Sequence, residues 1–413
     1  MRKGGDPRRR LHRATSALLA LTLLPVGVMV ATVHSPMASM LGWTAAPDPA
    51  TIRSQDTNVP MAEAFQRGLA SGLFAPFSWD GNVASGPFVQ FDYLDGSGPI
   101  AAYFLVNGSQ TSILVDSISV AGFAPNAPPV VAGATFITAD NDTTIIAHDE
   151  PTALLEIRTL SLPRSVILTF PAATTDLQVS RSDSWPAASL AFTSGGNNGR
   201  LIVGRGGLAL NGTTVTASLA ANDYLALRAV PGSSEHAMQR TALLDAFGSG
   251  RLAAEFALVA VSSGGWLENS ARYHDDLVLE SNEVQFNRAV LKLQTAGPQD
   301  GLVLLAFDPD TMPADSQHRL NVMANGVEIP EAADPLASLF ALPGSTDHAT
   351  YARLSMNATV LVVYVPDLSS ASLEVESVAL PPPGLDGPTQ MAIVAAVFLV
   401  AVSAAVMFRR RPE

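Results

Sequence analysis

Acidic residues at predicted turns are the groups in this sequence best suited to bind a metal ion. Asp308, Asp310 and Asp315 place three carboxylates close together in the chain, and calcium prefers such oxygen ligands. We therefore predict a calcium site at these three residues. They do not follow the loop pattern of the helix–loop–helix calcium motif. The alternative is that each carboxylate hydrogen-bonds its own backbone, as aspartates in turns often do.

Four asparagines lie in the pattern Asn-x-Ser/Thr, which is the acceptor signal for N-linked glycosylation. Each sits at a predicted turn or strand start, where a modifying enzyme would reach it if the chain is exported. The sequence therefore predicts glycosylation at Asn107, Asn141, Asn211 and Asn357.

Known catalytic motifs are absent from the sequence. It contains no Gly-x-Ser-x-Gly, no His-Glu-x-x-His and no phosphate-binding loop. Residues 204–209 superficially fit a dinucleotide fingerprint, but a predicted turn follows them where a phosphate cradle needs a helix. The chain also has no cysteine, which excludes thiol chemistry and disulfides. We predict no catalytic residue and no cofactor other than calcium, although a triad assembled by the fold stays open.

Two charge-free apolar segments, residues 14–33 and 391–408, bracket the chain. About 20 apolar residues span the roughly 30 Å hydrocarbon core of a bilayer, and both segments have basic residues on their outer side. Because basic flanks stay cytoplasmic, both ends are predicted inside the cell and the bulk of the chain outside. The C-terminal segment would anchor the chain in the lipid bilayer as a transmembrane helix.

The N-terminal segment has two readings. Basic residues, an apolar stretch and then small residues make a secretory signal peptide, whose cleavage would leave a single-pass membrane protein. The same stretch is long enough to span the bilayer as a retained anchor, which would make a two-pass protein.

The charge of the chain is strongly asymmetric. Its formal net charge is −13, but residues 14–408 contain 15 basic and 35 acidic residues, a net charge of −20. Such a surface repels nucleic acid. We therefore exclude nucleic acid as a partner.

Short apolar runs fill the predicted external region, and Gly, Pro, Asn and Asp interrupt them, which is typical of strands and turns. Asn-Gly pairs at 107–108, 211–212 and 325–326 each separate two such runs. They predict tight hairpins, because both central residues of such a turn need positive φ. We predict a mainly β fold: an antiparallel β-sandwich or jelly-roll-like ectodomain of two domains, with hydrophobic helices at both ends.

The predicted organisation follows from these signals. Residues 1–40 are a signal peptide or anchor, 41–85 a linker with a short helix, 86–232 a β-sandwich-like domain, 233–250 a connecting helix, 251–380 a second β-rich domain, 381–390 a Pro-rich spacer, 391–408 a transmembrane helix and 409–413 a cytoplasmic tail. A further short helix is expected after a cap at Asp334.

A stretch of the second half resembles the membrane-proximal module of uncharacterised archaeal membrane-anchored surface proteins. The likeness covers about residues 318–378 and rests on a hairpin at 320–328, a short helix, and the stretch 360–369. The histidine that often follows this last stretch in such proteins is missing here. The resemblance implies a β-rich, membrane-tethered ectodomain and no particular activity. The C-terminal order of motif, apolar helix and basic cluster also resembles archaeal sorting tails that are removed during lipid anchoring.

These observations favour a membrane-tethered extracellular protein with a binding, adhesion or envelope-structural role, whose surface polymer or protein partner the sequence does not identify. One alternative is an extracellular hydrolase or polysaccharide-acting enzyme, which would line a cleft with carboxylates and tryptophans such as Trp79, Trp185 or Trp266. Another is an accessory subunit of a membrane complex, contacting its partners through the small residues of the C-terminal helix.

Overall fold

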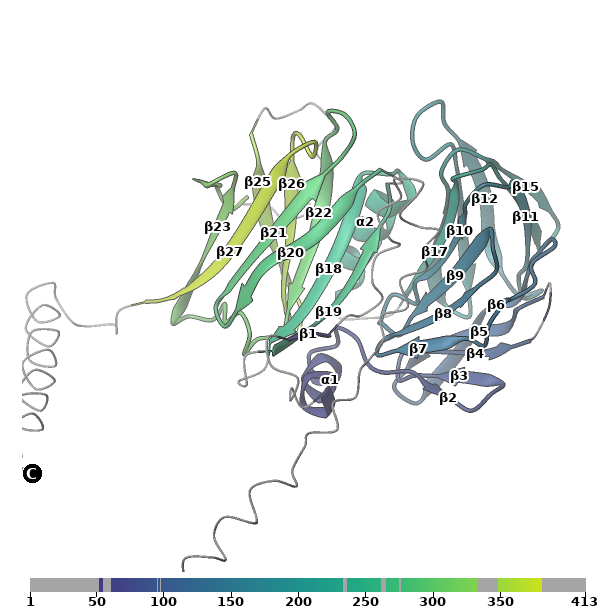
Figure 1. Ribbon diagram of the computed structural model, residues 1–413, viewed down its shortest axis with the longest axis horizontal. Coiled ribbons are helices and arrows are strands. Elements are labelled where there is room, and N and C mark those ends of the chain that lie inside the picture. Colours follow the sequence, from purple (N-terminus) through teal and green to yellow (C-terminus); the bar gives the residue numbers. More distant parts are fainter. Residues whose placement is uncertain are drawn as a thin grey trace, which may run out of the picture. The chain divides into compact units, whose positions relative to one another are not determined.

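The computed structural model describes residues 52–54, 61–94, 96, 98–232, 236–260, 265–274, 276–332 and 348–380 (Figure 1). All of them belong to one compact unit, residues 47–413. Both apolar end segments and the helix expected after Asp334 lie outside the described residues. Within the described part of the chain, no helix is long and apolar enough to cross a membrane.

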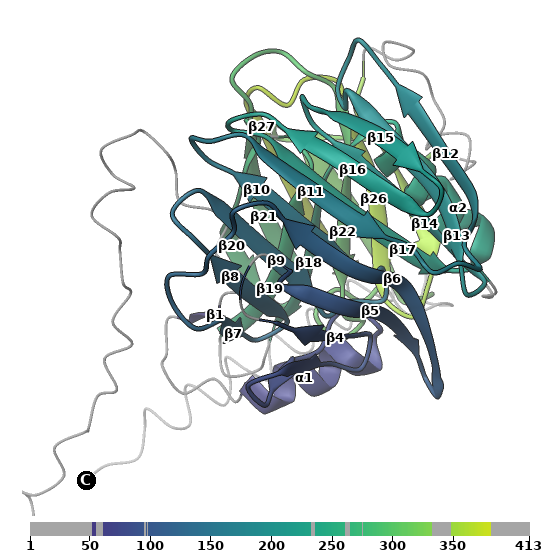
Figure 2. The same ribbon diagram turned by 90° about the vertical axis from the view of Figure 1, so that its right-hand side faces the viewer.

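The described chain is mainly β, as predicted, and its strands form four sheets that are antiparallel except for one parallel pair, β18 with β22. Two sheets have eight strands each. The inner eight-stranded sheet has the spatial order β12 (Thr175–Arg181), β13 (Ala188–Ser194), β14 (Asn197–Val203), β17 (Tyr224–Pro231), β10 (Leu155–Thr159), β9 (Thr143–His148), β8 (Thr135–Ala139) and β7 (Val130–Ala132). The outer one, whose strands β15 to β4 lie side by side in Figure 2, has the order β15 (Gly207–Asn211), β16 (Thr214–Leu219), β11 (Arg164–Thr169), β6 (Gln110–Val120), β5 (Ile100–Asn107), β4 (Val89–Tyr93), β3 (Val83–Ser85) and β2 (Ser78–Trp79).

The other two sheets are built mostly from the second half of the chain. The six-stranded sheet has the order β1 (Ile52–Ser54), β19 (Gly265–Arg272), β18 (Leu252–Ala260), β22 (Gly301–Phe307), β26 (Thr359–Val365) and β25 (Thr350–Ser355). The five-stranded sheet has the order β20 (Val278–Gln285), β21 (Arg288–Gln294), β27 (Ala371–Ala379), β23 (His318–Ala324) and β24 (Val327–Glu328).

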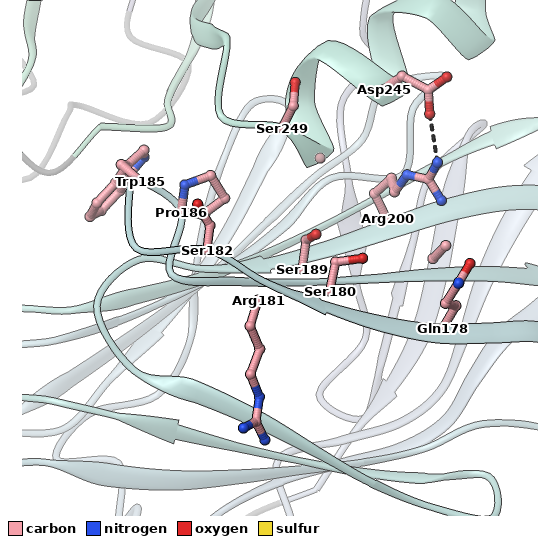
Figure 3. Close-up of a pocket in the computed structure, with 12 residues that line it drawn as sticks. Gln178, Ser180, Arg181, Ser182, Trp185, Pro186, Ser189, Arg200, Asp245 and Ser249 are labelled. Carbon is pink, nitrogen blue, oxygen red and sulfur yellow. Dashed lines mark hydrogen bonds and ion pairs between the residues drawn. The ribbon is translucent and has the colours of Figure 1, made fainter.

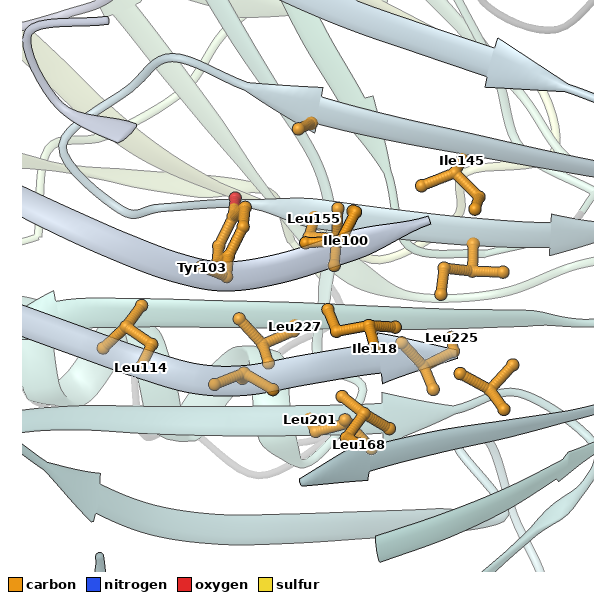
Figure 4. Packing of buried hydrophobic residues seen from close by; sticks show 14 of the residues in the cluster. Ile100, Tyr103, Leu114, Ile118, Ile145, Leu155, Leu168, Leu201, Leu225 and Leu227 are labelled. Carbon is orange, nitrogen blue, oxygen red and sulfur yellow. The ribbon is translucent and has the colours of Figure 1, made fainter. Parts of the chain in front are cut away.

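Each pair of sheets packs as a sandwich around its own core. Between the eight-stranded sheets, Ile118 and Leu168 of the outer sheet pack with Leu201, Leu225 and Leu227 of the inner one (Figure 4). A second core, with Phe256, Leu305 and Leu373 among its members, lies between the six-stranded and five-stranded sheets. Burying each such side chain stabilises the fold by about 1.5–3 kcal/mol. Strands with one face in a core alternate, as β13 does between buried and half-buried residues.

A third core, which we call the middle core, lies between the inner eight-stranded sheet and the six-stranded sheet. Helices α1 (Met61–Ala70) and α2 (Ala237–Gly248) contribute Phe65 and Phe247 to it, and the two sheets contribute Ala226 and Leu304 among others. Strands β17, β22 and β26 are buried along their whole length, because both faces of each are covered. That is why these three strands read as continuous apolar runs in the sequence.

All three predicted hairpins are present. In the first two, Asn107 and Asn211 end a strand and pair across the ladder, so the turn begins at the following glycine. In the third, Asn325 and Gly326 themselves form the turn, with φ of 53° and 75°. Both predicted helices within the described residues are also present, at α1 and α2.

The segment expected to be a linker, residues 41–85, contributes to both sandwiches where it is described. Strand β1 pairs with β19 of the six-stranded sheet, and α1 contacts β18 and β19. Strands β2 and β3 then join the edge of the outer eight-stranded sheet. Along the sequence, the chain therefore contributes to the second sandwich before it contributes to the first.

Candidate functional site

Arg228 of β17 lies in the middle core and is only 1% exposed. Its Nη1 forms an ion pair with Glu255 of β18 and donates to the Tyr273 hydroxyl at 3.3 Å. That hydroxyl in turn donates to Glu255 at 2.6 Å. The Nε of Arg228 is buried and has no hydrogen-bond partner among the described residues. Because a buried cation is tolerated only with a counter-ion, Glu255 is what permits an arginine here.

A chain of polar contacts beside it starts at Glu156 of β10. The guanidinium of Arg158 donates to this carboxylate at 2.5 and 2.9 Å, and Nε2 of His148 lies 3.4 Å from it. Burial raises the pKa of Glu156, but the charge of Arg158 and the contact with His148 outweigh burial and hold it at about 2. Burial lowers the pKa of His148, yet the close contact with Glu156 and the charge of that carboxylate raise it above its usual value. The pair is therefore stabilised as imidazolium and carboxylate.

Asn269 of β19 carries this chain of contacts across to the second sandwich. Nδ1 of His148 lies 3.0 Å from the Asn269 amide oxygen. The Asn269 amide nitrogen donates to one oxygen of Glu150 at 3.1 Å, and the hydroxyl of Thr152 donates to the other at 2.5 Å. Both Glu150 oxygens thus already accept a hydrogen bond.

Asp149 is a second buried carboxyl next to this chain of contacts. One oxygen accepts from the backbone N–H groups of Phe88 and Val89 at 2.9 and 2.8 Å, while the other has no partner among the described residues. Burial raises the pKa of Asp149 to about 8 against the lowering effect of those two N–H groups. Gly86 packs on the carboxyl so closely that a Cβ there would lie 2.2 Å from the Asp149 Cγ.

A cavity of about 290 Å³ opens beside these groups, and we call it the central cavity. Its polar wall includes Glu150, Arg228, Arg240, Glu255 and Asn269. Its apolar wall includes Leu243, Leu304, Ala306 and Val360. Concave sites with mostly apolar walls and a few converging polar groups are the usual places for ligands, so the central cavity is the candidate functional site.

Arg240 of α2 differs from Arg228 in lacking a counter-ion. It is half-buried, and no carboxylate pairs with it among the residues that the structure describes. Burial lowers the pKa of Arg240, and the nearby charge of Arg228 lowers it further. Two guanidinium groups therefore line one cavity, and only one of them is neutralised.

The predicted calcium ligands lie at other positions and have protein partners. Asp308 accepts hydrogen bonds from Nε and Nη2 of Arg67 at 3.2 and 2.5 Å, and the exposed Asp310 lies 3.7 Å from the same guanidinium. Asp315 pairs with His318 at 2.7 Å, a hydrogen bond that lowers the pKa of Asp315. Over the described ranges, no group of three or more His, Cys, Asp or Glu is placed to hold a metal ion. The cation at Asp308 is the guanidinium of Arg67.

The four predicted glycosylation acceptors share one property, which is that their asparagine side chains are exposed. Two end a strand at a hairpin and two lie in turns between strands. Exposure is what a modifying enzyme requires, and glycosylation stays a prediction. The acceptors are Asn107, Asn141, Asn211 and Asn357.

The three tryptophans that the structure describes are half-buried and pack against core residues. Trp79 packs against the first sandwich core and Trp266 against the second. The indole of Trp185 lies against His274 and Tyr224, with ring centroids 5.5 and 5.2 Å apart. The packing of Trp79 and Trp266 weighs against the polysaccharide-acting alternative, whereas Trp185 also lines a surface hollow.

A second hollow, of about 420 Å³, lies where β12 and β13 meet the C-terminal end of α2 (Figure 3). Arg200 points toward Asp245, which it meets at 2.6 Å, and Arg181 points away from both. The rest of the polar lining consists largely of serine hydroxyls, such as Ser180 and Ser189. Because Arg200 is neutralised, this hollow offers a ligand hydroxyl groups and no converging charge.

Sequence reasoning missed the residues of the central cavity. A usable signal was present, because Arg228 and Glu255 each interrupt a strand that is otherwise apolar. A charged residue inside such a strand predicts a buried group with a partner. The local sequence pattern does not predict which residue that partner is.

Comparison with known proteins gives no family for this chain. No protein family and no curated protein matches it. Among solved structures, the active YidC insertase with its first transmembrane domain resolved matches at a TM-score of 0.24 and 10% identity, over 40% of this chain and 43% of that one. YidC from Thermotoga maritima matches at a TM-score of 0.22 and 10% identity, over 38% and 51%. The chain spans about half the length of these structures or less, and scores this low do not show a shared fold.

Proposed function

We propose that this chain is a membrane-tethered extracellular surface protein whose β-rich unit binds a small molecule in the central cavity. The observation that carries the binding role is the cavity itself. Arg228, Glu255 and Asn269 from three strands and Arg240 from α2 converge on it opposite an apolar wall. Sheets covered on both faces hold these groups in place before a ligand arrives, which lowers the entropic cost of binding.

Three features support the location at the cell surface. The apolar segments 14–33 and 391–408 have the length and flanking charges of membrane anchors or export signals. The acidic charge between them keeps a surface domain soluble. The exposed acceptor asparagines suit an exported chain.

The binding role is tested by asking whether a small molecule accompanies the protein. We expect native mass spectrometry of the full-length chain from its own source to show a bound small molecule in the wild type. Ala306→Leu, which fills the cavity, should lose it, while Ala62→Leu, the same change at an exposed position of α1, should keep it. Equal retention by both variants, or an empty wild type, would contradict binding in this cavity.

The tether is tested by the intact mass of the same native protein. A mass that lacks the N-terminal segment and carries glycan increments would support an exported, single-pass surface protein. An undecorated full-length mass would instead favour a two-pass protein and the accessory subunit of a membrane complex.

A further inference from the structure

Arg240 of α2 brings hydrogen-bond donors to the central cavity, and no carboxylate in the described part of the chain pairs with them. Both oxygens of Glu150 already accept hydrogen bonds. One oxygen of Glu255 pairs with Arg228 and accepts from the Tyr273 hydroxyl. The Nε of Arg228 is enclosed by protein atoms, so Arg240 is the guanidinium that a ligand in the cavity would meet. A ligand that accepts hydrogen bonds would supply the partner that Arg240 lacks.

The charges around the cavity lead to the same conclusion. Glu255 neutralises Arg228, and Glu150 is linked through Asn269 to His148, whose pKa is raised. Arg240 is the remaining charge, and it has no carboxylate partner in the described part of the chain. A guanidinium binds carboxylates and phosphates through charge-assisted hydrogen bonds. The missing group is therefore an anion.

The opposite wall and the cavity volume determine the polarity and size of the rest of the ligand. Leu304, Ala306 and Val360 present an apolar surface. The cavity volume of about 290 Å³ is the volume that about ten water molecules occupy in liquid water. A saturated chain of about eight carbons with a single acidic head fits this space, whereas a long acyl chain does not.

Building on the proposed binding function, we infer that the ligand is a medium-chain anionic amphipath. Its carboxylate or phosphate head is held by Arg240, and its chain lies against Leu304, Ala306 and Val360.

The test is titration calorimetry with the full-length chain in lipid nanodiscs, with empty nanodiscs as the baseline. The probes are octanoate and octyl phosphate, which separate the two head groups, and octanol and octylamine, which replace the anion by a neutral or cationic group. We expect one of the two anions to bind at least about tenfold more tightly than octanol, because hydrogen bonds to charged groups are the stronger ones.

Variants assign the head group to its residue. Arg240→Gln should weaken the preferred anion about tenfold and leave octanol unchanged, and Arg240→Lys, which keeps the charge, should retain part of the affinity. Arg319→Gln removes an arginine from an exposed ion pair on β23 and should change nothing. Circular dichroism of each variant shows whether it has folded. If Arg240→Gln does not fold, the comparison of the four probes on the wild type still decides.

The outcomes separate this inference from the proposed function. If octanol or octylamine binds as tightly as the anions, or if Arg240→Gln weakens octanol as much as the anions, the anionic head is refuted while binding in the cavity stands. If no probe binds above the baseline, the ligand class is refuted. The proposed binding role is then judged by the molecule that accompanies the native protein.

Discussion

At the scale of single residues, Asp149 connects burial to a dependence of stability on pH. Its pKa is raised to about 8 in the folded protein by burial, against an ordinary value of 3.8. The folded protein therefore holds a proton that the unfolded chain releases between these two values. Stability from this group is present at low pH and is lost as the pH rises toward 8.

We expect Asp149→Asn to remove this dependence. Asparagine keeps an oxygen to accept from the backbone N–H groups of Phe88 and Val89 but has no proton to lose. As the pH rises from 4 to 8, the free energy of unfolding of the wild type should fall relative to that of the variant. The difference between the two should change by at most about 1.4 kcal/mol per pH unit. Urea unfolding of both proteins across this range measures the difference. Parallel curves would show that Asp149 is ionised in the folded state.

At the scale of elements, one ion pair holds α1 to the second sandwich. Arg67 on α1 binds Asp308 just after β22, and Nη1 of Arg67 also donates to the carbonyl oxygen of Ala260 at 2.8 Å. The Asp308 side chain is 2% exposed and that of Arg67 17%. Removing one member of such a buried pair strands the other charge, which costs about 3–5 kcal/mol.

We therefore expect Arg67→Met to lower the free energy of unfolding by about 3 kcal/mol. The double variant with Asp308→Asn should cost less than the sum of the two single changes. Arg319→Met, at an exposed pair with Glu328, should cost at most about 1 kcal/mol. Denaturant unfolding of the full-length chain measures all four variants.

Thermal unfolding of the wild type and of Asp308→Asn, with and without calcium, tests the calcium prediction. With Arg67 as the cation at Asp308, added calcium should leave the thermal midpoint of the wild type unchanged. A calcium-dependent rise that Asp308→Asn abolishes would instead identify Asp308 as a calcium ligand.

At the scale of the whole described unit, the middle core couples the two sandwiches. Phe247 of α2 is fully buried there, together with residues of the inner eight-stranded sheet and the six-stranded sheet. We expect Phe247→Ala to cost about 3–5 kcal/mol and to destabilise both sandwiches together. Hydrogen exchange should then accelerate in β6 and in β27 alike. Acceleration in one strand alone, or two separate unfolding transitions, would mean that the sandwiches are stable independently.

Local patterns predicted individual strands and turns better than they predicted sheets. The pattern at Asn325-Gly326 predicted a turn that the structure contains, because the requirement for positive φ is local. Strands β13, β19 and β25 mix polar residues into their sequences and lack the continuous apolar run that marks β17, β22 and β26. The sequence predicted two β-rich domains but not the middle core between them, because that core depends on which sheet faces pack together.

The sequence by itself determined that the described chain is mainly β, that hairpins occur at the three Asn-Gly pairs, and that thiol chemistry is excluded. Only the tertiary structure decided that Arg228 meets Glu255, that Asn269 reaches His148, and that Arg67 occupies Asp308 across 241 positions of sequence. The reason is physical. Periodicity and turn chemistry are set by a residue and its close neighbours, whereas a buried charge finds its partner only when distant strands and helices pack against each other.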